Sequence, residues 1–308
     1  KIKKNKNKYK ISSKDLNSII DKLNSSKKPL FLLGQGSNNQ YSKENLLSIF
    51  SDIKIPIVTT HIAKDVLYYN HNNFIGHPGP KGDRAGNFAV SNADLIIVLG
   101  SSLHSQTIGW NEKEFAKKAY KIHIDPDKSI LIKSKKIVNK QINSLSEYFF
   151  YNLKQKKNKI KCHSIWLNQC KNFKKKHPVI NEPHLRKKDK INYYDLVEQI
   201  SLNSLRNSTF VSGSGLGWYV TGQGLKLKRN QRFISSSSFG AMGYELPAAN
   251  GISLINKYQT VCILGDGSLM TNLHDLSMTK IANKNIKIFV YNNNGYTSIR
   301  NTQKNFFK

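Results

Sequence analysis

The sequence predicts an α/β protein with two doubly wound parallel-sheet domains in tandem. Short, apolar, β-branched runs that end at glycine or polar residues alternate with segments whose apolar residues recur at helical spacing. Right-handed crossover connections make such strands parallel, and helices then cover both faces of each sheet. At 308 residues the chain is long enough for two domains, each with its own hydrophobic core.

The first domain, expected over residues 1–151, is predicted to be Rossmann-like. It begins with an amphipathic helix at 15–23, whose four apolar residues fall on one face. His77, His104 and His123 are expected to be packing or loop residues and not catalysts. The other elements expected here are a strand at 29–33 closing on Gly34-Gln35-Gly36, a helical segment at 46–50, strands at 55–59, 94–99 and 121–125, and a loop at 76–86.

Residues 152–190, which are rich in lysine, are expected to be a linker, and 191–308 to form the second domain. Strands at 260–264 and 286–291 flank a predicted helix at 275–282, so the two strands should be parallel. Their polar tips therefore lie at one edge of the sheet, where open α/β sheets bind ligands. These tips are Gly265-Asp266-Gly267-Ser268 and Asn292-Asn293-Asn294-Gly295-Tyr296.

The two tips together can hold a magnesium diphosphate. Magnesium prefers octahedral oxygen coordination and takes few protein ligands besides phosphates. Asp266 would supply a carboxylate oxygen, Asn293 an amide oxygen and Gly295 a backbone carbonyl, while the Gly-Asp-Gly turn directs backbone N–H groups at an anion. A lone Gly-Asp-Gly is usually only a tight turn, so the second tip carries the prediction.

The pattern GDGS, a mostly helical spacer and then NNNGY resembles the cofactor signature of thiamine diphosphate enzymes. The upstream stretch 233–251 (FISSSSFGAMGYELPAANG) resembles acetohydroxyacid synthases and their decarboxylase and lyase relatives. By that resemblance, the Gly240 carbonyl would accept a hydrogen bond from the aminopyrimidine of the cofactor. Met242 would hold the cofactor bent. Without a relative in mind, 235–238 reads as a loop and 243–251 as a turn leading into a helix of small residues.

The resemblance implies thiamine diphosphate and Mg²⁺ as cofactors. The glycine-dense stretch 211–224 would let the backbone approach the diphosphate closely, although it lacks a full dinucleotide fingerprint. Gly240 and Met242 are the expected catalytic positions, and Asp266, Asn293 and Gly295 the metal ligands. The expected cofactor contacts are Gly215, Gly240, Met242, Gly265, Gly267, Ser268, Asn293, Gly295 and Tyr296.

The implied activity is acetolactate synthase-like: decarboxylation or carboligation of a small 2-oxo acid by a homodimer or homotetramer. The family pattern places arginine and aspartate after the strand at 94–99, whereas residues 101–106 (SSLHSQ) contain neither. FAD binding is therefore doubtful. The match is closer to less specialised relatives, such as those of surface-sugar gene clusters.

The family orders its domains as pyrimidine-binding, central and diphosphate-binding, and this sequence resembles the second and third. The pyrimidine-binding domain supplies the glutamate that activates the cofactor, and no glutamate here matches it. We therefore expect a fragment that lacks parts at both ends, including the close of its last domain. Such a fragment would be inactive alone, and a non-catalytic subunit with a cofactor half-site is the alternative.

The formal net charge of +30 raises nucleic acid or an anionic membrane as a partner. Lysine and asparagine are nevertheless scattered throughout, and no nucleic-acid-binding motif or P-loop occurs, so a basic nucleic-acid-binding protein is the least favoured alternative. Three cysteines without disulfide or zinc spacing favour reduced thiols in a cytoplasmic protein. No apolar run reaches transmembrane length, so no membrane partner is expected.

Overall fold

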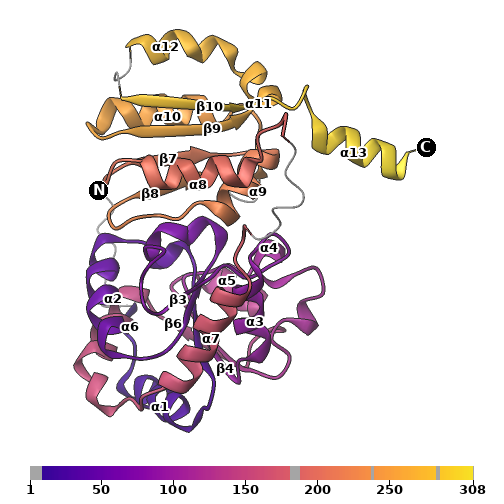
Figure 1. Ribbon diagram of the computed structural model, residues 1–308. Coiled ribbons are helices and arrows are strands. Elements are labelled where there is room, and N and C mark those ends of the chain that lie inside the picture. The colour runs from indigo at the N-terminus through magenta and orange to yellow at the C-terminus, as the bar shows by residue number, and fades with distance from the viewer. Residues whose placement is uncertain (1–8, 181–187, 237–238, 282–284, 308) are drawn as a thin grey trace. The chain divides into compact units, whose positions relative to one another are not determined.

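The computed structural model describes residues 9–180, 188–236, 239–281 and 285–307 of the chain (Figure 1). The chain divides into two compact units, Lys1–Val179 and Ile180–Lys308. Each unit contains one parallel sheet with helices packed on it, which confirms the predicted fold class.

The first unit is built on a six-stranded parallel sheet in the order β3-β2-β1-β4-β5-β6. The strand order reverses between β1 and β4, as in doubly wound folds that bind ligands at this switch point. Every residue of β1 and β4 is buried, because helices cover both faces. The strands are β1 (Pro29–Leu33), β2 (Ile57–Thr59), β3 (Phe74–Gly76), β4 (Leu95–Leu99), β5 (Tyr120–Asp125) and β6 (Lys140–Asn143).

Two hydrophobic clusters cover the two faces of this sheet. Alternate strand residues pack with α1 (Ser13–Ser25), α2 (Gln40–Asp52) and α6 (Ser146–Gln155) on one face. The intervening strand residues pack with α3 (Arg84–Asn92), α4 (Ser105–Ile108) and α7 (Ser164–Lys176) on the other. The short helix α5 (Lys128–Ser134) joins β5 to β6. The predicted first helix is confirmed as α1, and its cap is Ser12, whose hydroxyl accepts the backbone N–H of Asp15 at 3.0 Å.

The first unit continues well beyond residue 151, where its end was expected. Trp166, Leu167 and Cys170 form a buried face of α7, and the Trp166 indole N–H donates to the Pro29 carbonyl at 3.0 Å. Much of the expected linker at 152–190 is therefore packed into this unit, and residues 181–187 lie outside the described part of the chain. The helical spacing of apolar residues within this lysine-rich stretch is the sequence pattern that could have predicted the packing of α7.

The loop expected at 76–86 is shorter than predicted. Strand β3 ends at Gly76, and helix α3 begins at Arg84 after the cap residue Asp83. The Asp83 carboxylate accepts the backbone N–H of Gly86 at 2.6 Å and that of His77 at 2.7 Å. These two hydrogen bonds fold the segment back and begin the helix.

The second unit contains a four-stranded parallel sheet in the order β10-β9-β7-β8. The predicted parallel pairing of β9 with β10 is confirmed, with register from Ile286 opposite Thr260 to Tyr291 opposite Gly265. The strands are β7 (Thr209–Ser212), β8 (Arg232–Ser235), β9 (Thr260–Gly265) and β10 (Ile286–Tyr291).

Helices α8 (Tyr193–Asn203) and α9 (Gly215–Gly224) pack on one face of this sheet, and α10 (Glu245–Ile255) packs on the other. The glycine-dense stretch after β7 thus becomes helix α9. Between β9 and β10 lie α11 (Asp266–Thr271) and α12 (Leu276–Ile281). The helix predicted at 275–282 corresponds to α12, and residue 282 lies outside the description.

Helix α13 (Thr297–Phe306) follows β10 and extends away from the sheet of the second unit (Figure 1, yellow). None of its side chains is buried. All three cysteines are free thiols, with Cys170 and Cys262 buried and Cys162 exposed. Within the described residues, no helix has the length and apolar character needed to cross a bilayer.

Candidate cofactor site

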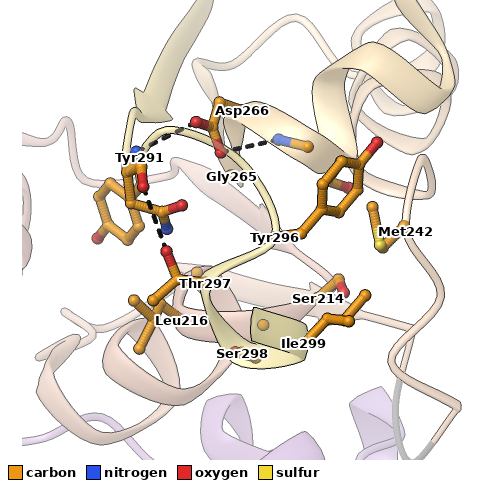
Figure 2. A pocket seen from close by; sticks show the side chains of 15 residues that line it. Ser214, Leu216, Met242, Gly265, Asp266, Tyr291, Tyr296, Thr297, Ser298 and Ile299 are labelled. Atoms are coloured by element: carbon orange, nitrogen blue, oxygen red, sulfur yellow. Dashed lines mark hydrogen bonds between the residues drawn. The ribbon is translucent and has the colours of Figure 1, made fainter. Parts of the chain in front are cut away.

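A pocket lies where β7, β9 and β10 end, within the second unit (Figure 2). Most of the predicted site residues line it: Gly215, Met242, Gly265, Asp266, Gly267, Ser268, Asn293 and Tyr296. The structure adds residues that the sequence analysis did not single out: Ser214, Leu216, Gly217, Tyr291, Thr297, Ser298 and Ile299. The first three of these fall inside the glycine-dense stretch, which was the signal available for them.

The Asp266 carboxylate joins the two predicted tips. Its Oδ2 accepts the backbone N–H of Gly295 at 2.7 Å. Oδ2 also accepts the backbone N–H of Asn293 at 3.1 Å, and Oδ1 accepts that of Gly267 at 2.8 Å (Figure 2). Burial acts to raise the pKa of Asp266, but these backbone hydrogen bonds outweigh it and hold the pKa below its ordinary value. The carboxylate is therefore ionised at neutral pH, and Oδ1 retains a lone pair for a cation.

The Asn293 amide oxygen is the second candidate ligand. Its Oδ1 atom is buried and has no hydrogen-bond partner among the described residues. A buried acceptor without a partner is costly and is rare in folded proteins, so it calls for an explanation such as a bound ion. An amide oxygen and an ionised carboxylate are both oxygen donors of the kind that Mg²⁺ takes.

Glycines leave open space around this pair. A Cβ atom added to Gly265 or Gly295 would meet nothing within 4 Å, and one added to Gly215 would meet only the Ser298 hydroxyl at 4.0 Å. Gly215 and Gly295 also have positive φ values of 55° and 76°, which other residues rarely adopt. The bare backbone there can approach a diphosphate closely, so the residues present fit a magnesium diphosphate.

Tyr296 and Met242 lie near each other along one side of the pocket (Figure 2). The Tyr296 ring packs on Gly267, where an added Cβ would lie 3.0 Å from the ring, so a side chain at this position would require the half-exposed ring to shift. Two predicted residues are not in the pocket lining. Gly240 has a φ of 58° and borders residues 237–238, which are outside the description, while Gly295 contributes its N–H to Asp266.

Arg300 and Thr297, on helix α13, also hold the second tip in place. The Arg300 guanidinium donates to the carbonyls of Asn293, at 3.0 Å, and of Asn294, and the Thr297 hydroxyl donates to the Asn293 carbonyl at 3.3 Å. Sequence reasoning missed this pair because the contacts depend on the turn at Tyr296, whose φ is 44°. The only local sign of this pair in the sequence is that Thr297 and Arg300 are three residues apart, a spacing that brings two side chains together on one face of a helix.

No group of three or more His, Cys, Asp or Glu side chains that could hold a metal occurs among the described residues. The predicted magnesium ligands are one carboxylate, one side-chain amide oxygen and one backbone carbonyl. Only the carboxylate belongs to those four residue types, so these ligands do not form such a group. The arrangement suits a hard cation that shares its coordination with phosphate oxygens.

Comparison with known protein families matches both units. Residues 16–145 match the thiamine pyrophosphate enzyme central domain, and residues 215–308 match the thiamine pyrophosphate enzyme C-terminal TPP binding domain. The two matches are in the order that the sequence resemblance implied.

Individual relatives agree with the family matches. The chain is 30% identical to the acetolactate synthase large subunit of Cyanidium caldarium over 92% of its own length and 48% of the relative. It is 26% identical to the acetolactate synthase isozyme 1 large subunit of Escherichia coli (strain K12), over 96% of the chain and 52% of the relative. For the chloroplastic acetolactate synthase 1 of Nicotiana tabacum the identity is 27%, over 95% of the chain and 44% of the relative.

The chain thus spans about half the length of the curated relatives that it matches. Both family matches fall on the parallel-sheet units, and the second includes the strand tips that meet at Asp266. The chain therefore belongs to the thiamine pyrophosphate enzyme family, of which it carries the central domain and the C-terminal TPP-binding domain.

Proposed function

We propose that this chain carries the metal and diphosphate half of an acetolactate synthase-like site. The whole protein would decarboxylate or carboligate a small 2-oxo acid and would depend on thiamine diphosphate and Mg²⁺. The proposal rests on the ionised Asp266 carboxylate, which accepts the Asn293 backbone N–H, and on the buried Asn293 amide oxygen, which has no hydrogen-bond partner among the described residues. The names of the relatives support the reaction class.

Each residue has a separate task in this proposal. Asp266, Asn293 and the Gly295 carbonyl hold Mg²⁺, and the glycines with Ser268 hold the diphosphate. Met242, with the Gly240 carbonyl, orients the other end of the cofactor. When bound, thiamine diphosphate supplies the carbon nucleophile and electron sink for decarboxylation, while the protein binds and orients it.

The first test compares Asp266→Asn with Asp275→Asn, a matched change in the same unit but outside the pocket. Isothermal titration measures thiamine diphosphate binding with and without Mg²⁺ in the complete polypeptide that carries this chain. Asp266→Asn should weaken binding at least ~100-fold, because even outer-shell partners of metal ligands change affinity by roughly 10–100-fold. Wild-type binding in Asp266→Asn would refute the metal assignment.

The second test asks what the 308-residue chain needs in order to act. Decarboxylation of pyruvate is assayed with the chain alone and with a pyrimidine-binding domain supplied on the same polypeptide or in trans. We expect activity only on complementation, since the activating glutamate comes from that domain in this family. Activity from the chain alone would overturn the half-site proposal, and cofactor binding without turnover on complementation would favour a non-catalytic subunit.

A further inference from the structure

We propose that Glu245 is a positioning residue that sets the shape of the cofactor pocket by holding the residues that line it. It does not line the pocket, and sequence reasoning gave it no role. The inference rests on the proposed function for the identity of the ligand. Its own basis is a set of hydrogen bonds made by one buried carboxylate.

Glu245 is the first residue of α10 and has 0% of its surface exposed. Its Oε1 atom accepts the backbone N–H of Ser214 at 2.9 Å, and its Oε2 atom accepts the hydroxyl of Ser268 at 2.6 Å. The Ser268 oxygen in turn accepts the backbone N–H of Gly243 at 2.8 Å. Both carboxylate oxygens are thus engaged with segments that border the pocket.

These contacts connect three walls that are far apart in the sequence. Ser214 precedes α9 and lines the pocket, and Ser268 follows Asp266 in α11 and also lines it. Gly243 follows Met242, a third lining residue, and its carbonyl accepts the side-chain amide of Asn272 at 2.8 Å. Movement of the Glu245 carboxylate would therefore shift two sides of the pocket together: the side formed by Ser214 and Ser268, and the side formed by Met242.

The chemistry of the contacts favours a carboxylate. An ionised carboxylate only accepts hydrogen bonds, so it fixes the Ser268 hydroxyl as a donor toward Glu245 and leaves the Ser268 oxygen to accept from Gly243. Glutamine has the same shape, and its Oε1 atom could still accept from Ser214, but its NH₂ group would face the Ser268 hydroxyl. The Ser268 oxygen would then have to accept a second hydrogen bond, and the hydroxyl hydrogen would lose the acceptor that it has in Glu245.

Burial raises the pKa of Glu245 above its ordinary value, and the hydrogen bonds from Ser268, Ser214 and Gly213 limit that rise. The start of helix α10 also favours a negative charge. The backbone comes very close, since a Cβ added to Gly213 would lie 2.9 Å from the Glu245 carboxyl carbon.

The test compares Glu245→Gln with Glu198→Gln in the complete polypeptide. Glu198 is a matched control because it lies in the same unit, pairs with Lys226 and is not part of the pocket lining. We measure the thiamine diphosphate concentration for half-activation at saturating Mg²⁺, the KM for pyruvate and the thermal unfolding midpoint. Glu245→Gln should raise the half-activating concentration at least ~10-fold and leave KM within about twofold, whereas Glu198→Gln should change neither.

A merely structural role would give a different pattern. It would lower the unfolding midpoint and the active fraction without moving the half-activating concentration of the folded enzyme. If Glu245→Gln does not fold, Glu245→Asp keeps the charge and shortens the side chain by one methylene, so that contacts with Ser214 and Ser268 cannot both form. It should raise the half-activating concentration in the same way.

The outcomes separate this inference from the function on which it rests. A wild-type enzyme that responds to thiamine diphosphate, with a folded Glu245 variant that matches it within about twofold, overturns the role of Glu245 alone. A wild-type enzyme that shows no response overturns the proposed function, and this inference with it.

Discussion

The two units share one architecture but use glycine in opposite ways at the ends of their strands. In the first unit the loops after β1 and β4 close on each other: the Gly36 N–H donates to the Gly100 carbonyl at 2.9 Å, and a Cβ on Gly34 would lie 2.2 Å from that oxygen. In the second unit, a Cβ on Gly265 or Gly295 would meet nothing within 4 Å. One edge is filled by its own backbone, and the other is open to a ligand.

Glycine after a buried strand therefore has two physical meanings. It can let two backbones touch, or it can leave a surface that a phosphate group can approach. The sequence patterns of the two edges are alike. Within the part of the chain that the structure describes, it is the second edge that has, among its glycines, a carboxylate and an amide oxygen without a hydrogen-bond partner. The polar partners, more than the glycines, identify a binding edge.

The units also differ in how completely their apolar side chains are covered. Helices cover both faces of each sheet, but the second unit also exposes a group of apolar side chains on the segment 270–281 and on the edge strand β10. Exposed edges and apolar patches are typical of surfaces that a partner covers. The members of this group are Met270, Leu273, Leu276, Met278, Ile281 and Val290.

The sharpest test of the glycine comparison is the same substitution made at both edges. Gly34→Ala should lower the free energy of unfolding by about 2–3 kcal/mol, because the added methyl overlaps backbone that cannot move aside. Gly265→Ala should change it by less than about 0.5 kcal/mol, since its φ of −82° suits alanine and space is available. Urea unfolding measures both.

Gly265→Ala should nevertheless weaken thiamine diphosphate binding, measured by titration, because its methyl group occupies the space assigned to the diphosphate. Gly34→Ala should not affect binding in the protein that remains folded. If Gly34→Ala were neutral for stability, or Gly265→Ala neutral for binding, the contrast between a filled edge and an open edge would be lost.

A smaller effect is expected at Met242, which belongs to the open edge but not to the metal site. In the complete enzyme, Met242→Ala should slow turnover at saturating cofactor about 10-fold while changing cofactor affinity less, because a prop contributes to positioning. Titration and steady-state kinetics on the same preparation separate the two. A loss confined to binding, with turnover unchanged, would reject the role of Met242 as a prop.

The smallest expected effect is on the pH dependence of stability in the first unit, where His71 and His123 are buried. Burial lowers the pKa of both His71 and His123 to about 4, from the ordinary histidine value of 6.5. Between those values the unfolded chain binds protons that the folded chain does not, so the contribution to stability is complete above pH 6.5 and is lost as pH falls toward 4. His274, in the second unit, is exposed.

Unfolding of the first unit, followed by urea titration from pH 7 to pH 4, checks this sign. In His123→Asn the fall in unfolding free energy should be smaller than in wild type by more than about 1 kcal/mol. His274→Asn, at an exposed position of the second unit, is the control, and unfolding of the first unit should be the same in it as in wild type. If the unfolding free energy of His123→Asn fell between pH 7 and pH 4 as much as that of wild type, the buried His123 ring would not contribute to the pH dependence of stability.

The sequence predicted what short-range patterns determine. Strands β1, β9 and β10 and helix α1 were found from apolar periodicity, and Asp266 and Asn293 were expected to meet because parallel strands end at one edge. Glu245 was missed because its role depends on Ser214 and Ser268, which only the folded chain brings to it. The packing of α7 was missed because abundant lysine obscured its apolar face.

Two of the backbone hydrogen bonds to Asp266 have a consequence for how the cofactor would arrive. The N–H groups of Asn293 and Gly295 fasten their loop to the start of α11 through groups of the chain itself. The entropy of ordering that loop is then lost during folding and not at the moment of binding. Association should accordingly be limited by encounter and by the release of water from magnesium, with no slow loop-closing phase in stopped-flow traces.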